Sequence, residues 1–210
     1  MKKYSKIALL IFLSAGIVPG CKKSSSAPKD YTQSIKDKTW WGTFNYTGSP
    51  EEYYSVQFNA DNSLTWSQWA GNYPGHWVLD EKTLTMTFTG SSLQIKADIS
   101  GDSLINITDN TSASDIKSGH LNTNTNQSLD NTVWTGSFIS SNSPFQLKFM
   151  PGSNVTLVAG GSSGPHLYAR TASGAIIRSG AANIFAIVTS DGEMRGSYAS
   201  SVATWHLAKQ

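Results

Sequence analysis

Trp40-Trp41-Gly42-Thr43-Phe44 is a stretch whose pattern returns at Trp134-Thr135-Gly136-Ser137-Phe138. In both places an apolar residue, Ile35 or Leu129, precedes the first tryptophan by five positions. Every second residue of each stretch is apolar or glycine, and this period of two is typical of a strand with one buried face. We therefore expect the two stretches to open equivalent strands of two related units.

The repeat extends beyond these opening strands. YSVQFNADNSLT (54–65) corresponds to FQLKFMPGSNVT (145–156), with a turn-forming pair, Asp61-Asn62 or Pro151-Gly152, inside each. Three weaker correspondences follow in the same order: Gly75-His76-Trp77 with Pro165-His166-Leu167, IKADISGD (95–102) with IFAIVTSD (184–191), and Gly119-His120-Leu121 with Trp205-His206-Leu207. The preserved order indicates a duplicated unit of roughly 80 residues.

The pattern in each unit predicts about eight short antiparallel strands, because apolar and polar residues alternate and turn residues interrupt the alternation every 8–12 positions. No sustained 3.6-residue period occurs between residues 37 and 210, so we expect almost no helix. A meander of this size removes its exposed edges by closing on itself. The predicted fold is all-β, with two tandem up-and-down β-barrels at residues 35–125 and 126–210.

The opening Gly/Trp strand, the hairpin turns and the Gly75, Trp77, Leu79 strand resemble lipocalin-like (calycin-type) domains of bacterial envelope lipoproteins. The resemblance implies a barrel and suggests a small apolar ligand inside it. Against a ligand in the first unit, several large aromatic residues point inward, so we expect a solidly packed interior there: Trp40, Phe44, Phe58, Trp66, Trp77 and Phe88. The second unit, richer in Gly and Ala, is expected either to have more room or to use these small residues for a close approach of its strands.

The first 20 residues have the three parts of a secretory signal: Lys2, Lys3 and Lys6, then an apolar run, then Val18-Pro19-Gly20-Cys21. That last segment resembles a lipobox, which implies an acylated (palmitate-carrying) Cys21 after a signal peptide at 1–20. Residues 21–34 then read as a flexible tether. We expect a membrane-anchored lipoprotein of the bacterial cell envelope, most simply in the outer membrane. The alternative is ordinary secretion with a free thiol.

The predicted facing of the strands leaves apolar residues on the outer surface. Trp41, Tyr53 and Trp69 fall in the outward phase of the first unit, and Phe185 and Ile187 do so in the second. Exposed apolar patches of this kind usually make a contact. One interpretation is docking between the units, with Trp41 and Trp69 against Phe185 and Ile187. The other is a surface that stacks on sugar rings or on a partner protein. Trp41, Tyr53 and Trp69 are the candidate binding residues.

No set of residues for catalysis stands out, so we expect neither an enzyme nor a cofactor. Glu51-Glu52 reads as a solvated loop, because adjacent residues point apart. The four histidines appear as matched pairs, His76 with His166 and His120 with His206, each alone and in the outward phase, which argues against a metal site. The arginines Arg170, Arg178 and Arg195 all fall in the second unit, either as an anion-binding rim or as solvated residues.

The formal charge of the precursor is +2, and it becomes −1 when the three signal lysines are removed, so nucleic acid is not an expected partner. The function that these observations favour is a non-enzymatic binding or interaction module for a small molecule, a glycan or a protein. Three alternatives remain: an inhibitor of a secreted or host peptidase, a glycan-binding surface protein that uses the exposed aromatic residues, and a structural spacer that holds some surface away from the membrane.

Overall fold

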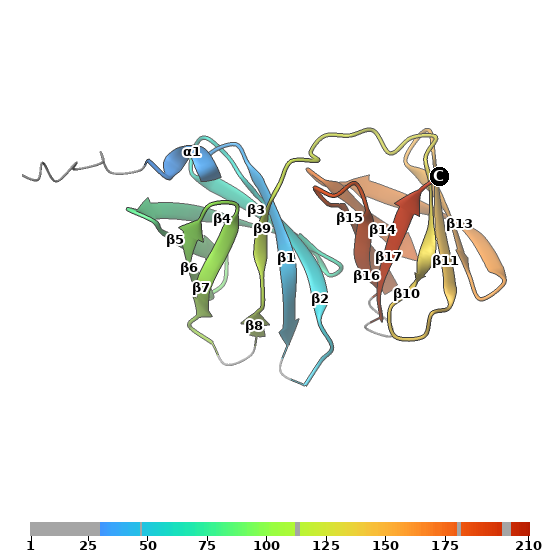
Figure 1. The fold of residues 1–210 in the computed structure, drawn as a ribbon, viewed down its shortest axis with the longest axis horizontal. Helices are drawn as coiled ribbons and strands as arrows, with labels where there is room; N and C mark the ends of the chain where they lie inside the picture. Colours follow the sequence, from blue (N-terminus) through green and yellow to red (C-terminus); the bar gives the residue numbers. More distant parts are fainter. Residues whose placement is uncertain (1–29, 47, 112–113, 180–181, 199–202) are drawn as a thin grey trace, which may run out of the picture.

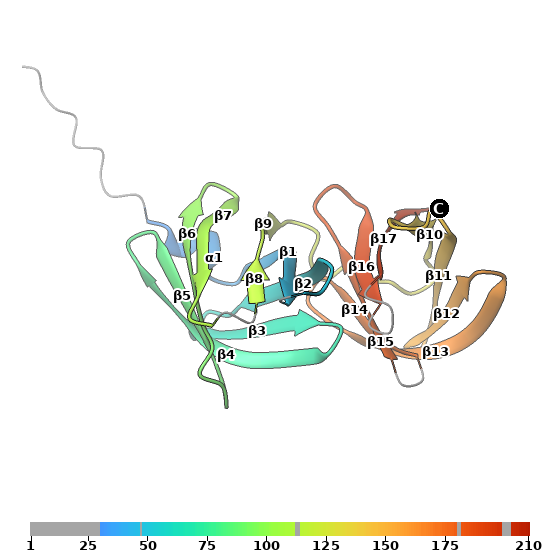
Figure 2. The ribbon, with the colours of Figure 1, turned by 90° about the horizontal axis from the view of Figure 1, so that it is seen from below.

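The computed structural model describes residues 30–46, 48–111, 114–179, 182–198 and 203–210. The chain folds into two closed antiparallel β-barrels that lie side by side (Figures 1 and 2). The all-β prediction, with two tandem barrels, is confirmed. The signal segment and Cys21 lie outside the described residues.

The first barrel is a meander in which two short strands take the place of one last strand. Its elements are α1 (Thr32–Ile35), β1 (Thr39–Tyr46), β2 (Glu52–Phe58), β3 (Ser63–Gln68), β4 (Gly71–Asp80), β5 (Thr83–Phe88), β6 (Gln94–Ser100), β7 (Ser103–Asp109), β8 (Ser114–Ile116) and β9 (Gly119–Asn122). Both β8 and β9 pair with β1, and β1 pairs with β2, so the sheet closes.

The second barrel is a continuous meander of eight strands that closes through β10 and β17. Its strands are β10 (Val133–Phe138), β11 (Pro144–Met150), β12 (Asn154–Ala159), β13 (Ser162–Arg170), β14 (Gly174–Ser179), β15 (Ala182–Val188), β16 (Met194–Tyr198) and β17 (Ala203–Lys209).

The duplication predicted from the opening strands is present in the register. Trp40 lies opposite Val56 in the first barrel, and Trp134 lies opposite Leu147 in the second. Even the turn before each opening strand is repeated: the Lys38 amide donates to the Ile35 carbonyl at 3.0 Å and the Thr132 amide to the Leu129 carbonyl at 3.1 Å. The predicted inward residues of these strands are buried in two separate cores.

The predicted histidine pairs are wrong. Ser63 lies opposite His76, whereas its counterpart Asn154 lies opposite Leu167, so His76 corresponds to Leu167 and not to His166. His166 is therefore one position out of phase and shares the inward side with Gly164 and Tyr168, contrary to the outward phase expected. The predicted pair rests on one identical residue, histidine, whereas the strand register aligns His76 with Leu167.

The final strands also align differently from the prediction. Trp41 lies opposite His120, while Thr135, its counterpart, lies opposite Ala208. His120 therefore corresponds to Ala208, two residues beyond His206. The place of His206 is taken in the first barrel by Ser118, in the gap between β8 and β9, where it bonds to Thr43.

One end of the first barrel is closed by α1. Ile35 is fully buried, and the Trp40 indole donates from Nε1 to the Ser34 carbonyl at 3.2 Å. Tyr31 packs against the same core. The predicted flexible tether, which ran to residue 34, is therefore wrong in its last residues, because burial of Tyr31 and Ile35 orders the chain before β1. Among the described residues, no helix has the length and apolar character needed to cross a bilayer.

Candidate functional site

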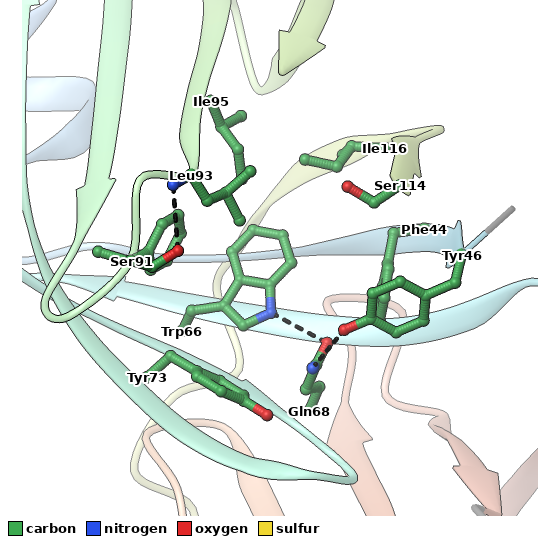
Figure 3. Close-up of a pocket in the computed structure, with 11 residues that line it drawn as sticks. Phe44, Tyr46, Trp66, Gln68, Tyr73, Ser91, Leu93, Ile95, Ser114 and Ile116 are labelled. Atoms are coloured by element: carbon green, nitrogen blue, oxygen red, sulfur yellow. Dashed lines mark hydrogen bonds between the residues drawn. The ribbon is translucent and has the colours of Figure 1, made fainter. Parts of the chain in front are cut away.

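The end of the first barrel opposite α1 is where β1 ends and where β8 lies (Figure 1). We call it the open end, because a pocket is lined by residues of these strands. A pocket of about 200 Å³ occupies this end. It is lined by side chains from six strands and the connecting loop after β5: Phe44, Tyr46, Trp66, Gln68, Tyr73, Phe88, Ser91, Leu93, Ile95, Ser114 and Ile116 (Figure 3). The expectation of a solidly packed first barrel is wrong at this end.

The floor of the pocket is an aromatic cluster. Trp66 stacks on Tyr54 with ring centroids 3.9 Å apart and an interplanar angle of 6°. Phe44 and Phe88 meet the Trp66 ring edge-on, at 6.1 and 6.0 Å. Because Trp66 lies flat against its neighbour, it lines one side of the barrel and leaves the centre of the open end free. Burial raises the pKa of the Tyr54 phenol, whose hydroxyl donates to the Ser118 carbonyl at 2.7 Å.

A short chain of hydrogen bonds links Trp66, Gln68 and Tyr46 (Figure 3). Apart from this chain, Ser91 Oγ accepts from the Leu93 amide and Ser114 Oγ donates to Asp109 Oδ2. The Trp66 Nε1 donates to Gln68 Oε1 at 3.3 Å, and Gln68 Nε2 donates to the Tyr46 hydroxyl at 3.2 Å. Gln68 is buried, while Tyr46 and Tyr73 are each 39% exposed. The Tyr46 hydroxyl accepts from Gln68, so its own proton is directed elsewhere. The pocket thus offers an apolar interior with one hydroxyl fixed by a buried amide.

Among the described residues of the second barrel, a tryptophan fills the place that is equivalent to this pocket. Ile116 lies opposite Phe44 in the first barrel, and Trp205 lies opposite Phe138 in the second. Trp205 is fully buried and its ring centroid lies 5.1 Å from that of Phe145. The prediction that the second unit has more room is therefore wrong: its glycine at position 196 gives room to the Trp205 ring, which a Cβ there would meet at 2.3 Å.

The candidate binding residues Trp41, Tyr53 and Trp69 lie together on the outer face of the first barrel, against the second barrel. Tyr53 belongs to a buried cluster with Ile176, Phe185 and Ile187, and Trp41 and Trp69 pack against this cluster. We call these residues the inter-barrel cluster. The docking interpretation placed Trp41 and Trp69 beside Phe185 and Ile187, and that is where the structure has them. A ring that stacks on sugar would need a free face, and the second barrel covers this surface.

Polar contacts surround the inter-barrel cluster. The Tyr53 amide donates to Ser197 Oγ at 2.8 Å, and the Asn122 side chain donates to the Val188 carbonyl at 2.8 Å. The Arg195 guanidinium lies 5.3 Å above the Trp41 ring and also pairs with Asp191 at 2.5 Å. These bonds fix the angle between the barrels as well as their contact.

Glu52 is buried beside the cluster, in contrast to the solvated loop predicted for Glu51-Glu52; only Glu51 is exposed. The Trp69 indole donates to the Glu52 carboxyl. Burial raises the pKa of Glu52, and the bond from Trp69 offsets part of that rise. The pair Glu51 and Glu52 does not have the facing carboxylates that glycoside hydrolysis uses.

The remaining candidate residues, the histidines and arginines, do not come together in one site. Among the described residues, no group of three or more His, Cys, Asp or Glu side chains is placed to hold a metal ion. Of the arginines, Arg195 is engaged between the barrels, Arg178 is exposed, and Arg170 donates to the Gln127 carbonyl. They do not form a common rim. The pocket was missed by sequence reasoning because its signal is a single difference, Ile116 in place of Trp205, in a strand whose alignment was shifted.

The chain matches no protein-family model, no curated protein and no solved structure. The barrels are compatible with a lipocalin-like fold, and the site has to be interpreted from its own geometry.

Proposed function

We propose that this chain is a non-enzymatic binding protein of the bacterial cell envelope, anchored through lipid on Cys21, and that the open end of its first barrel holds a small, largely apolar molecule. The observation that carries the proposal is the aromatic pocket in which the buried Gln68 amide fixes the Tyr46 hydroxyl. Pockets of this kind bind through apolar contact and use a few polar groups for orientation. The resemblance to lipocalin-like domains supports the same class of function.

The size of the pocket limits the ligand. Its volume of about 200 Å³ exceeds that of an engineered apolar cavity of ~150 Å³ that takes up benzene, and it is below the range of ~300–1,000 Å³ typical of drug-sized ligands. The flat Trp66 ring and the edge-on rings around it favour a planar molecule. We expect one or two fused rings with one group that accepts a hydrogen bond from Tyr46.

The position of the pocket supports an anchored receptor. The described chain enters the first barrel at the end where α1 lies, and β8 and the end of β1 lie at the other end (Figure 1). The pocket is lined by residues of β8 and of the end of β1. A lipid on Cys21 would hold the closed end toward the membrane. The pocket would then face away from the bilayer, where a ligand arrives from the aqueous phase.

Calorimetric titration of the purified chain with 1-naphthol, indole and decanoate tests the proposal. We expect 1-naphthol to bind one site per chain with a Kd of about 10–100 μM, which is ordinary for a ligand of this size. Ile116→Trp, which copies the residue found in the second barrel, should abolish binding. Ile105→Trp makes the same change on the outer face of the same barrel, at a residue 42% exposed, and should leave binding intact.

The proposal fails if none of the three compounds gives a binding isotherm, or if Ile116→Trp binds as well as the unmodified chain. The anchor is tested separately by growing cells with labelled palmitate. Label should enter the unmodified protein and be absent from Cys21→Ser.

A further inference from the structure

The two barrels enclose a second cavity, which the proposed function does not use. It is a polar groove of about 170 Å³ next to the inter-barrel cluster. The first barrel supplies one wall from the outward residues of β2, β3 and β4: Ser55, Gln57, Thr65, Ser67 and Asn72. The second barrel supplies the other wall from the turn between β13 and β14, with Arg170 and Thr171.

The walls of the groove are fixed in place. The apolar half of the β2–β3 outer face packs in the inter-barrel cluster, and the polar half of the same face continues into the groove. Ser67 Oγ donates to Asn72 Oδ1 at 2.8 Å, and Arg170 is held by its bond to the Gln127 carbonyl. The turn itself is tied to the linker by a 2.9 Å bond from the Asn126 amide to the Ala172 carbonyl. Because its walls are already ordered, the groove needs little rearrangement to bind a ligand.

The chemistry of the groove is that of a hydroxylated ligand. Serine and threonine hydroxyls and the amides of Gln57 and Asn72 both donate and accept hydrogen bonds, as sugar hydroxyls do. The Thr171 hydroxyl is buried and has no hydrogen-bond partner among the described residues, although buried polar groups are nearly always paired. Thr171 itself is one of the residues that line the groove.

The charge of the groove further restricts the chemistry of the ligand. Arg170 is the one charged side chain among the lining residues, and no carboxylate lies beside it in the lining. A guanidinium binds carboxylate groups with strong, charge-assisted hydrogen bonds. The volume, close to that of an apolar cavity of ~150 Å³ that holds benzene, admits one six-membered ring. We propose that the groove binds a monosaccharide that carries a carboxylate, an acidic sugar.

Saturation-transfer NMR with glucuronate and with glucose tests this proposal on the full chain. We expect glucuronate to receive saturation and glucose, which lacks the carboxylate, to bind at least five times more weakly. Arg170→Met should weaken glucuronate binding about tenfold or more. Arg178→Met removes an exposed arginine of the same barrel outside the groove and should change nothing.

Gln57→Leu provides a second test, because Gln57 is exposed and its replacement leaves the cores intact. It should weaken glucuronate binding several-fold. The proposal is overturned if glucuronate shows no saturation transfer, if glucose binds as well as glucuronate, or if Arg170→Met and Arg178→Met behave alike. Ile116→Trp should leave glucuronate binding unchanged, so failure of the apolar pocket and failure of the groove are distinguishable.

Discussion

A large aromatic ring packs inside each barrel, but the ring comes from a different strand in each. In the first barrel the large ring comes from β3, where Trp66 lies opposite Val56, and β8 supplies only Ile116. In the second, β12 supplies Leu157 at the position of Trp66, and β17 supplies Trp205. The ring from β3 lies flat on Tyr54, and the ring from β17 fills the centre. A cavity therefore depends on which strand carries the ring.

Their outer faces differ in a complementary way. Where the first barrel has Trp41, the second has Thr135, and where the second has Phe185 and Ile187, the first has Lys96 and Asp98. Each barrel therefore has an apolar face that its partner lacks. Docking of these two different faces covers both of them. The equivalent positions on the other barrel, Thr135 for Trp41 and Lys96 and Asp98 for Phe185 and Ile187, are polar.

The largest expected effect tests the difference at the open ends. Trp205→Ala should lower the free energy of unfolding by about 3–5 kcal/mol, because a fully buried tryptophan leaves a cavity. Ile116→Ala should cost about 2 kcal/mol, the low end for such changes, because one side of Ile116 already faces the pocket. Urea denaturation followed by circular dichroism measures both.

The same Trp205→Ala chain should gain a second site for 1-naphthol, if it remains folded at the titration temperature. Equal losses of stability for the two alanine variants, or no second site in folded Trp205→Ala, would show that Trp205 does not fill the place that is empty in the first barrel.

The second prediction breaks the contact between the barrels. Trp41→Ala combined with Trp69→Ala should lower the free energy of unfolding by about 2–4 kcal/mol, because both rings pack on the buried cluster and lose apolar contact. Thermal unfolding by calorimetry should change from one transition to two, as the barrels lose their coupling. Val78→Ala combined with Leu167→Ala, at residues 63% and 61% exposed, is the control and should keep a single transition. Two transitions already present in the unmodified chain would contradict the coupling.

Sequence alternation predicted most of this architecture. The inward residues of β1, β2 and β3 follow from a period of two, and the same reasoning placed Trp41 and Trp69 opposite Phe185 and Ile187. The match of His76 with His166 rests on one identical residue and is wrong by one position, and a slip of one residue reverses the face of the strand. Sequence reasoning also missed the pocket, since the volume left in a barrel depends on how Trp66 and Ile116 pack in three dimensions. The groove depends on the angle between the barrels, which no local pattern encodes.

The third prediction concerns pH. The pKa of Glu52 is raised by burial, so between its unfolded and folded pKa values the folded state binds more protons than the unfolded state. Stability should therefore fall as pH rises through that window above pH ~4.3 and then stay lower at neutral pH. Glu52→Gln should remove this fall and raise the melting temperature at pH 7, while its amide oxygen still accepts the bond from Trp69. The effect should be smaller than that of the tryptophan pair.

The counterpart of Glu52 in the second barrel is the exposed Ser143, which gives a control. Ser143→Ala should leave the pH dependence of the melting temperature unchanged. If Glu52→Gln has the same pH profile as the unmodified chain, ionisation of Glu52 does not limit the stability of the interface.

The smallest expected effect concerns Arg195, whose guanidinium lies 5.3 Å above the Trp41 ring. Such an interaction contributes about 0.5–1 kcal/mol at a partly exposed site. Arg195→Met keeps much of the side-chain length and the apolar contact but removes the charge, so it isolates the electrostatic part. Urea denaturation of Arg195→Met, Trp41→Leu and the double variant gives the coupling energy between the two residues. Because the pairs with Asp191 and Glu193 are lost equally with and without Trp41, they cancel in this cycle. A coupling energy of zero would mean that Arg195 is held by its carboxylates alone and that the charge above the Trp41 ring does not stabilise the inter-barrel contact.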